Sequence, residues 1–260
     1  MKLDMKVTGG NPMRSRWPSN HIRNSIVWPL LALSLSACNS IAALTGDSFT
    51  PEGQLPADFS IKAQAHYGVA NGCDGRSQAK SFESGFQDDP QHYSFTIPVS
   101  YRDGLCEMRL ARVGLYIHGR YGDKDWQRTY DNGGLVLVDR LPEGAPNFEA
   151  DGSLTNQAEC TWLFQISKLR LELSKLLTCK GAGTYLVASE LSGKTVRFNF
   201  NTNPQERPYM NGYWLQTPSG WKPCTGRWGT QFEELCTSPP QFRSFQMSGK
   251  QCTVYPNCTE

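Results

Sequence analysis

The chain has 260 residues, and 26 Lys and Arg against 24 Asp and Glu give it a net charge of +2. Its 38% hydrophobic and 19% charged content excludes a disordered acidic tail and a protein with many membrane spans. The small net charge gives no electrostatic basis for binding nucleic acid, which requires a concentrated basic surface. The length suits one large domain or two small ones.

Residues 1–37 have the organisation of a bacterial secretory signal peptide. Three arginines lie within 14–23, and an apolar run over 26–33 follows them. The run is too short for a stable membrane anchor, which needs about 20 apolar residues. Met13 is a second candidate for the first residue, because residues 1–12 do not have the composition of a signal.

The signal ends in Leu35-Ser36-Ala37-Cys38, which resembles the lipobox of bacterial lipoproteins. The resemblance implies that the Cys38 thiol carries acyl chains such as palmitate, and several chains would hold the protein persistently at about 0.8 kcal/mol per buried methylene. Residue 39 is Asn rather than Asp, which by resemblance to Gram-negative lipoproteins implies the outer membrane, facing the periplasm. The alternative is an ordinary signal with a cysteine at this position by chance.

Residues 38–56 are expected to form the lipid anchor and a flexible tether. The stretch contains Gly46, Pro51, Gly53 and Pro56 and few large apolar side chains, a composition typical of linkers. An ordered N-terminal strand is the alternative.

A β-rich domain is expected over 57–182, because apolar residues alternate with polar ones. The alternation is clearest over 93–101, where Pro98 indicates an edge strand or a bulge. Further strands are expected over 59–67, 106–118, 135–138 and 159–166, with a bulge near Arg112 and a turn at 131–134.

Residues 167–178 fit two structures. One face of a helix would contain Leu169, Leu173, Leu176 and Leu177, whereas one face of a strand would contain Leu169, Leu171 and Leu173. We slightly favour a helix, because Lys, Leu, Arg and Glu are all strong helix formers.

Residues 183–260 are expected to form a Cys- and Trp-rich C-terminal module, or an extension of the same sheet. Val196, Phe198 and Phe200 alternate with polar residues, as in a strand, and the remainder is rich in Pro, Gly, Trp, Tyr and Cys. The whole pattern predicts a mainly β, sandwich-like fold of antiparallel sheets with one helix and a disulfide-stapled C-terminal module.

Eight cysteines remain besides Cys38, and an even number in an exported chain predicts four disulfides. They are Cys73, Cys106, Cys160, Cys179, Cys224, Cys236, Cys252 and Cys258. Of the many possible pairings we favour sequence neighbours: 73–106, 160–179, 224–236 and 252–258. Metal binding is the alternative, but the spacings lack the CxxC pairs of structural zinc sites. We expect neither a metal nor a cofactor.

No recognisable catalytic motif is present in the sequence, and we expect a protein that is not an enzyme. The segment 192–195 resembles the end of a phosphate-binding loop, but Ala188 stands where the first glycine is required. The SxxK motif at 77–80 lacks the partner motifs of penicillin-binding proteins. Adjacent Asp88 and Asp89 could supply paired carboxylates, but such neighbours in a loop normally face water.

Aromatic residues in turns form two candidate partner-binding surfaces. The first comprises Tyr209, Tyr213, Trp214, Trp221 and Trp228. Aromatic side chains give large contact area at small entropic cost, so they are frequent in binding hot spots, and they could also stack on sugar rings. The alternative is that they form the small core of the module. The second surface is the loop 119–131, where Trp126 lies among charges that include Asp123 and Asp125; its alternative is a solvated hairpin tip.

The C-terminal part of the chain resembles a group of envelope proteins. The lipobox, the cysteine-bearing β domain, the segment 213–224 (YWLQTPSGWKPC) and the ending 252–260 (CTVYPNCTE) are similar to lipoproteins encoded beside type VI secretion effectors. Those lipoproteins act as immunity proteins, notably against phospholipase toxins. The resemblance, clearest over 158–260, implies a non-catalytic protein that binds and occludes a secreted toxin. A glycan-binding or structural envelope lipoprotein is the alternative, and an unrecognised envelope enzyme is a third.

Overall fold

The computed structural model describes residues 47–70, 72–210, 212–224, 236 and 240–259. The expected signal peptide, Cys38 and the first part of the expected tether lie outside the described residues. Of the helices in these described ranges, none has the length and apolar character needed to cross a membrane. The helical pieces described are two short 3-10 turns, η1 (Asp125–Gln127) and η2 (Ala188–Glu190), and the predicted mainly β class is confirmed.

The first sheet, as far as the structure describes it, has six strands in mixed orientation. Its order is β10 (Leu173–Lys180), β9 (Ser153–Ile166), β12 (Thr195–Pro208), β1 (Ser48–Leu55) and β4 (Gln91–Ser94), and β5 (Ile97–Pro98) also pairs with β1. Strand β12 runs parallel to both β9 and β1, and the other pairs are antiparallel.

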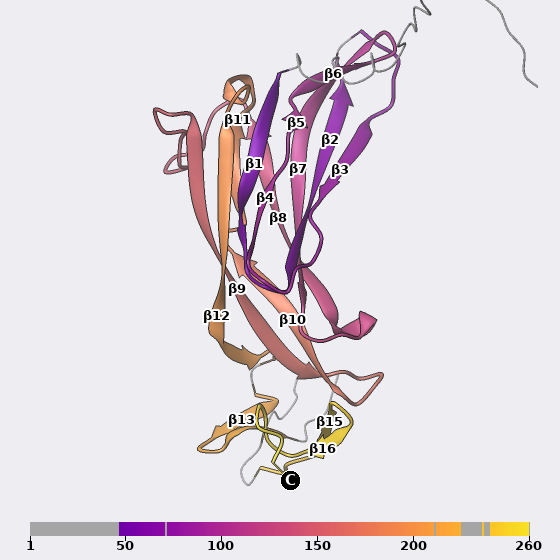
Figure 1. The fold of residues 1–260 in the computed structure, drawn as a ribbon, viewed down its shortest axis with the longest axis vertical. Coiled ribbons are helices and arrows are strands. Elements are labelled where there is room, and N and C mark those ends of the chain that lie inside the picture. The colour runs from indigo at the N-terminus through magenta and orange to yellow at the C-terminus, as the bar shows by residue number, and fades with distance from the viewer. Residues whose placement is uncertain (1–46, 71, 211, 225–235, 237–239, 260) are drawn as a thin grey trace, which may run out of the picture. The chain divides into compact units, whose positions relative to one another are not determined.

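The second sheet contains six described strands as well. Its order is β11 (Gly183–Val187), β8 (Arg128–Val138), β7 (Cys106–Arg120), β2 (Phe59–Val69) and β3 (Gln78–Glu83), and β6 (Ser100–Asp103) also pairs with β7. The two sheets face each other (Figure 1), and their apolar side chains meet in one core. Phe59 of β2 and Trp162 of β9 pack edge to face across this core, with ring centroids 5.9 Å apart. The predicted sandwich is therefore confirmed.

The expected flexible tether is wrong for residues 48–55, which form β1 inside the first sheet. Phe49 and Leu55 of β1 are buried in the core. Gly53 is required there for a steric reason, since a Cβ at this position would lie 1.9 Å from the carbonyl oxygen of Phe198 in β12. Gly53 therefore permits close pairing of β1 with β12, whereas the composition of residues 38–56 indicated a linker.

The expected helix over 167–178 is also wrong. Residues 173–180 form strand β10, which pairs residue by residue with β9, including Leu177 with Trp162. Leu173 and Leu177 are buried, while Leu169 and Leu171 lie in the exposed loop before the strand. Local helix propensity amounts to a few tenths of a kcal/mol per residue, and pairing with β9 overrides it.

The turn expected at 131–134 lies instead in the middle of β8. Its glycines serve a close backbone approach, because a Cβ on Gly133 would lie 1.9 Å from the carbonyl oxygen of Ala182. The Gly134 amide donates a hydrogen bond to that same carbonyl at 3.0 Å. Gly133 is therefore needed where β11 joins the sheet, and no chain reversal occurs there.

The strand expected over 93–101 is divided into three short strands around Pro98. Strands β4 and β5 pair with β1 in the first sheet, and β6 pairs with β7 in the second. The chain crosses between the sheets where Pro98 cannot donate a backbone hydrogen bond. The bulge expected near Arg112 is confirmed, since the pairing with β2 skips Ala111.

Residues 183–208 belong to the two large sheets, as β11 and β12. The domain boundary expected at 183 therefore falls within the sandwich, whose last strand ends at Pro208. Two small hairpins follow: β13 (Trp214–Thr217) with β14 (Gly220–Pro223), and β15 (Phe245–Met247) with β16 (Lys250–Cys252). We call the described residues within 209–259 the C-terminal module.

A second hydrophobic cluster joins this module to the ends of β9 and β10. The sandwich contributes Phe164, Ile166 and Leu173, and the module contributes Tyr213, Trp214, Phe245, Cys252 and Tyr255. Phe164 contacts three module rings, with centroids 4.5 Å from Tyr255, 4.9 Å from Trp214 and 5.8 Å from Trp221. The core of the module is therefore shared with the sandwich.

All four disulfides predicted between sequence neighbours are present. They are Cys73–Cys106, Cys160–Cys179, Cys224–Cys236 and Cys252–Cys258. The second joins residues that pair directly across β9 and β10, whereas the last two lie in the module.

Candidate functional site

Two neighbouring loops form the first candidate surface, which we call the loop face. They are the β7–β8 loop, residues 121–127, and the β9–β10 loop, residues 167–172. The guanidinium of Arg170 lies over the ring of Trp126 with its carbon 4.8 Å from the ring centroid, so the two loops are in contact. The predicted surface over 119–131 thus has a second component that was not predicted from the sequence.

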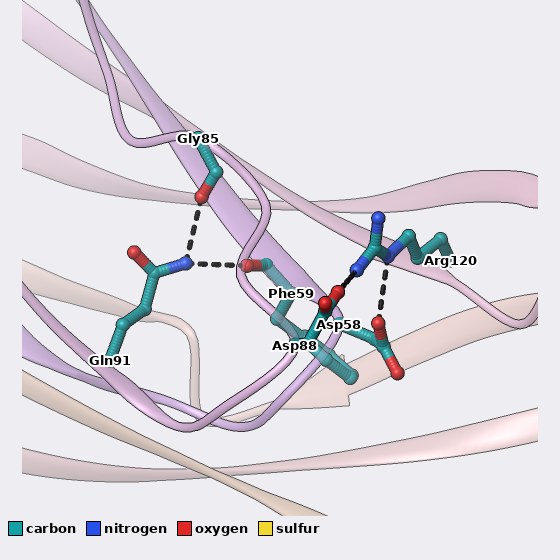
Figure 2. Close-up of polar contacts among 6 residues, drawn as sticks. All are labelled: Asp58, Phe59, Gly85, Asp88, Gln91 and Arg120. Carbon is teal, nitrogen blue, oxygen red and sulfur yellow. Dashed lines mark hydrogen bonds and ion pairs between the residues drawn. The ribbon is translucent and has the colours of Figure 1, made fainter.

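A polar clamp fixes the base of the β7–β8 loop, as Figure 2 shows. The Nε of Arg120 donates to Asp58 Oδ1 at 2.7 Å, and its Nη2 donates to Asp88 Oδ1. The side-chain amide of Gln91 donates through Nε2 to the carbonyl oxygens of Phe59 at 2.9 Å and Gly85 at 2.7 Å. These two bonds hold the segment that carries Asp88. The carboxylate of Asp88 therefore positions a loop and does not form a paired acid with Asp89.

Trp126 is partly buried on this loop. Its ring packs edge to face against Tyr121, with centroids 6.4 Å apart, and the Lys124 ammonium lies 5.5 Å from its centroid. Asp123 and Asp125 are exposed beside it. The predicted binding candidates Trp126, Asp123 and Asp125 are thus brought together, with the aromatic ring at the centre and the charges around it.

The β9–β10 loop projects two leucines into solvent. Leu169 is 95% exposed and Leu171 is 67% exposed. The loop is nevertheless ordered by its own backbone: the Leu171 amide donates to the Ser167 carbonyl at 2.8 Å, and the Ser167 amide donates to the Glu172 carbonyl at 2.9 Å. Leu171 has a φ of 54°, which is unusual for a bulky residue and costs conformational energy. Two exposed leucines on a hydrogen-bonded turn, one of them at positive φ, make this loop a candidate contact surface.

An apolar depression of about 310 Å³ lies beside these leucines. Ile166, Ser167, Lys168, Leu171 and Arg243 line it. Burial lowers the pKa of the Arg243 guanidinium. The loop face therefore combines projecting apolar groups with an adjacent concave site.

The predicted aromatic set is divided by the structure. Tyr213 and Trp214 are each 6% exposed and pack in the second core, as the structural alternative proposed. Tyr209 is 49% exposed, and Trp221 is partly buried. Trp228 lies outside the described residues.

Trp221 forms part of a polar groove, the second candidate surface. The groove has a volume of about 430 Å³ and lies where β9 and β12 meet β13 and β14. Besides Trp221 it is lined by Glu159, Thr161, Lys180, Asn203, Arg207 and Gln216, together with Gln205 and Glu206. The Trp221 amide donates to the Tyr255 carbonyl at 2.8 Å and the Tyr255 amide donates back at 2.9 Å, which fixes the backbone of the aromatic residue. We call this site the Trp221 groove.

A charged network underlies the Trp221 groove. The Lys175 ammonium lies 2.6 Å from Glu206 Oε1, and the Tyr255 hydroxyl donates to Glu206 Oε2. Burial, together with the nearby Glu206 carboxylate, raises the pKa of Tyr255 far above its usual value, so the hydroxyl remains a donor. The three residues come from β10, β12 and the last segment of the chain, which is why sequence reasoning missed them.

The two remaining sequence motifs, at 192–195 and 77–80, make contacts that stabilise the fold. Residues 192–194 form the turn before β12, where the Ser192 hydroxyl donates to Asp47. In the SxxK motif, the Lys80 ammonium lies 3.2 Å from the centroid of the Tyr101 ring. Among the residues that the structure describes, no group of His, Cys, Asp and Glu side chains is placed to hold a metal ion.

Comparisons of the chain with protein-family models, curated proteins and solved structures find no match.

Proposed function

We propose that this chain is a non-catalytic, lipid-anchored protein of the cell envelope that binds and occludes a secreted toxin, an enzyme of the lipase or phospholipase class. The observation that carries the proposal is the loop face, with Leu169 and Leu171 exposed on a rigid turn beside the Trp126–Arg170 stack. The resemblance of the C-terminal sequence to immunity lipoproteins supports the class of partner.

The composition of the loop face suits a protein partner. Trp, Tyr and Arg are enriched in the residues that dominate binding energy, and such residues act best inside a ring of polar contacts. Trp126, Tyr121 and Arg170 form the aromatic and cationic centre, and Asp123 and Asp125 lie at its edge. A partner with an apolar patch flanked by both signs of charge would complement this surface.

Hydrogen bonds hold both loops in the conformation described, which should reduce the entropy lost on binding. The Arg120 clamp fixes one loop, and the hydrogen bonds around Ser167 fix the other. Occlusion requires only that projecting loops cover the mouth of the toxin's active site, so the inhibitor needs no reactive group of its own.

Lipidation at Cys38 would place the inhibitor on the surface that a lipid-degrading toxin attacks. Confinement to that surface raises the effective concentration and therefore the occupancy of the complex without any new contact. Neither nucleic acid nor a cofactor has a part in this mechanism.

The proposal is tested with secreted toxins encoded beside this gene, each purified and titrated with the full-length chain. We expect one of them to bind and to lose its lipase activity. Leu169→Asp and Trp126→Ala should each weaken binding about tenfold or more, since both remove groups from the centre of the surface. Leu105→Asp is the matched control, because Leu105 is a fully exposed leucine on the β6–β7 turn, outside the loop face. The proposal is wrong if no such toxin binds, or if the control weakens binding as much as Leu169→Asp does.

A further inference from the structure

We infer that the Trp221 groove is a saccharide-binding site, separate from the loop face and independent of the proposed toxin inhibition. Its volume of about 430 Å³ is within the range of small-molecule sites, and it would hold one or two sugar rings of a longer chain.

The first observation is the aromatic wall. The backbone of Trp221 is fixed by two hydrogen bonds to Tyr255, and its ring packs edge to face against Phe164 with the ring centroids 5.8 Å apart. A tryptophan held in this way loses little entropy when a ligand packs on it, and its large apolar face suits the C–H face of a pyranose ring.

The second observation is the polar lining. Gln205 and Gln216 offer side-chain amides that both donate and accept hydrogen bonds, and Arg207 offers a planar guanidinium with several donors. Asn203 already donates to Glu159 Oε1 at 3.1 Å and accepts from the Gln205 backbone amide at 2.8 Å, so Asn203 and Glu159 are held in place within the lining. A ligand with many neighbouring hydroxyls can bond to the glutamines and to Arg207 at once, whereas an apolar ligand would displace water from them without replacing its hydrogen bonds.

The third observation is the small net charge of the site. The acidic lining residues Glu159 and Glu206 lie among the basic residues Lys180 and Arg207, and Glu206 also pairs with Lys175 beneath the groove. The site therefore has one basic group more than acidic groups, which is far from the concentrated positive charge of a nucleic-acid surface and from the excess of carboxylates of a divalent-cation site. A polyhydroxylated ligand with little charge suits this lining.

The fourth observation is a bulge in β12 at the groove. The pairing of β12 with β9 shifts between Asn203 and Arg207, so that strand β12 has extra residues at this point. Bulges redirect side chains and are frequent beside functional sites. Here the bulge places Glu206 against Lys175 while Asn203 and Gln205 line the groove.

The experiment measures binding of the full-length chain to three carbohydrates: insoluble peptidoglycan, N-acetylglucosamine tetramer and cellotetraose. We expect co-sedimentation with peptidoglycan or saturable binding to at least one soluble tetramer. Binding to the acetylated ligands alone would identify an amino-sugar glycan, and binding to cellotetraose as well would identify a general β-linked polysaccharide.

Trp221→Ala should weaken that binding about tenfold or more. Because Trp221 also contacts the second core, Gln216→Ala serves as a second variant, since this side chain is exposed and lies at the groove. It should weaken binding with unchanged near-ultraviolet circular dichroism. Trp126→Ala is the matched control and should retain saccharide binding while losing the toxin.

Absence of binding to all three carbohydrates would overturn the inference, as would variants Trp221→Ala and Gln216→Ala that bind as tightly as the unchanged chain. Neither result bears on toxin inhibition, because that function is tested with the loop-face variants.

Discussion

The sandwich and the C-terminal module differ in how each obtains a hydrophobic core. The sandwich buries a continuous cluster between two six-stranded sheets, with residues such as Ile61, Ile117 and Phe198 fully enclosed. The module has two hairpins of three or four residues per strand, too small to enclose a core alone. It shares Phe164, Ile166 and Leu173 with the sandwich and has two disulfides of its own.

The small C-terminal module is therefore ordered by a core that it shares with the sandwich and by two disulfides. Both candidate surfaces lie where the two regions meet. The backbone amide of Gln246 donates to the Leu171 carbonyl at 3.2 Å, so the module supports the loop face. The Trp221 groove is lined by residues of both regions. Loosening the module should therefore affect function before it affects the sandwich.

Phe164→Ala should have the largest effect on this arrangement. The side chain is fully buried and contacts three module rings, so its loss should destabilise the docked module by about 4 kcal/mol. Amide hydrogen exchange should become faster in β13–β16 while β2 and β7 retain their protection. The matched control is Phe242→Ala, whose side chain is 44% exposed and should contribute about 0.5 kcal/mol or less. Uniform loss of protection in both regions would contradict the division into two regions.

Removal of single disulfides should show that the sandwich and the module differ in stability. Cys160 and Cys179 are 19 residues apart in sequence, and Cys224 and Cys236 are 12 apart, so each link should contribute about 3 kcal/mol by restricting the unfolded chain. Replacing the first pair by alanine should lower the urea midpoint of the whole sandwich. Replacing the second should open only the module, as seen by exchange in 212–224 and 240–259. Loss of sandwich protection in the second variant would argue against independent opening.

The Lys175–Glu206 pair lies within the sandwich, and Glu206 connects it to the module by accepting a hydrogen bond from the Tyr255 hydroxyl. Both side chains are largely buried, at 19% and 24% exposure, so Lys175→Met should destabilise the protein by about 2 kcal/mol by leaving a buried carboxylate without its cation. The double variant Lys175→Met with Glu206→Gln should recover most of that loss, as measured by urea unfolding. Arg109→Ala is the control, because its pair with Glu107 is exposed and should contribute under about 0.5 kcal/mol. A double variant as unstable as Lys175→Met would contradict this explanation.

His118 should give the smallest effect, within the sandwich alone. Burial lowers the pKa of this imidazole below its ordinary value of 6.5, with Glu83 opposing and Lys62 adding to the shift. The unfolded chain therefore binds the proton more readily, so this contribution to stability is present above about pH 6.5 and is lost as the pH falls through the folded-state pKa. His118→Gln should reduce the loss of unfolding free energy between pH 7.5 and pH 5 by about 0.5 kcal/mol, since solvent screens a partly exposed group. An unchanged or steeper pH dependence of the unfolding free energy in His118→Gln would contradict this contribution of His118.

Much of the sandwich could be predicted from alternating apolar residues, as in Ile61 to Tyr67 and Val196 to Phe200. The disulfide pairing also followed from sequence proximity. Strand β1 was missed because its Pro51 and Gly53 are typical of linkers, although Gly53 is required by contact with β12. The parallel pairs of β12 were not predicted, since alternation does not reveal strand direction.

The candidate sites were harder to predict than the fold. Trp126 and Trp221 stood out as aromatic residues in turns, but the same signal selected Tyr213 and Trp214, which are core residues. The sequence pattern predicts a regular element at Leu169 and Leu171, and only the position of β10 places them in an exposed loop. The Lys175–Glu206–Tyr255 network joins three distant segments, and no local pattern indicates such a contact.

The most direct test of the central claim is a contact-dependent killing competition on a surface. A strain lacking this gene is grown against its parent, with and without an active secretion apparatus in the parent, and is complemented with the unchanged gene, Leu169→Asp or Leu105→Asp. We expect the deletion strain to die only when the parent can inject its toxin. The unchanged gene and Leu105→Asp should restore survival, and Leu169→Asp should not, at equal protein abundance. Equal survival of the deletion strain and its parent under verified toxin delivery would contradict toxin inhibition by the loop face.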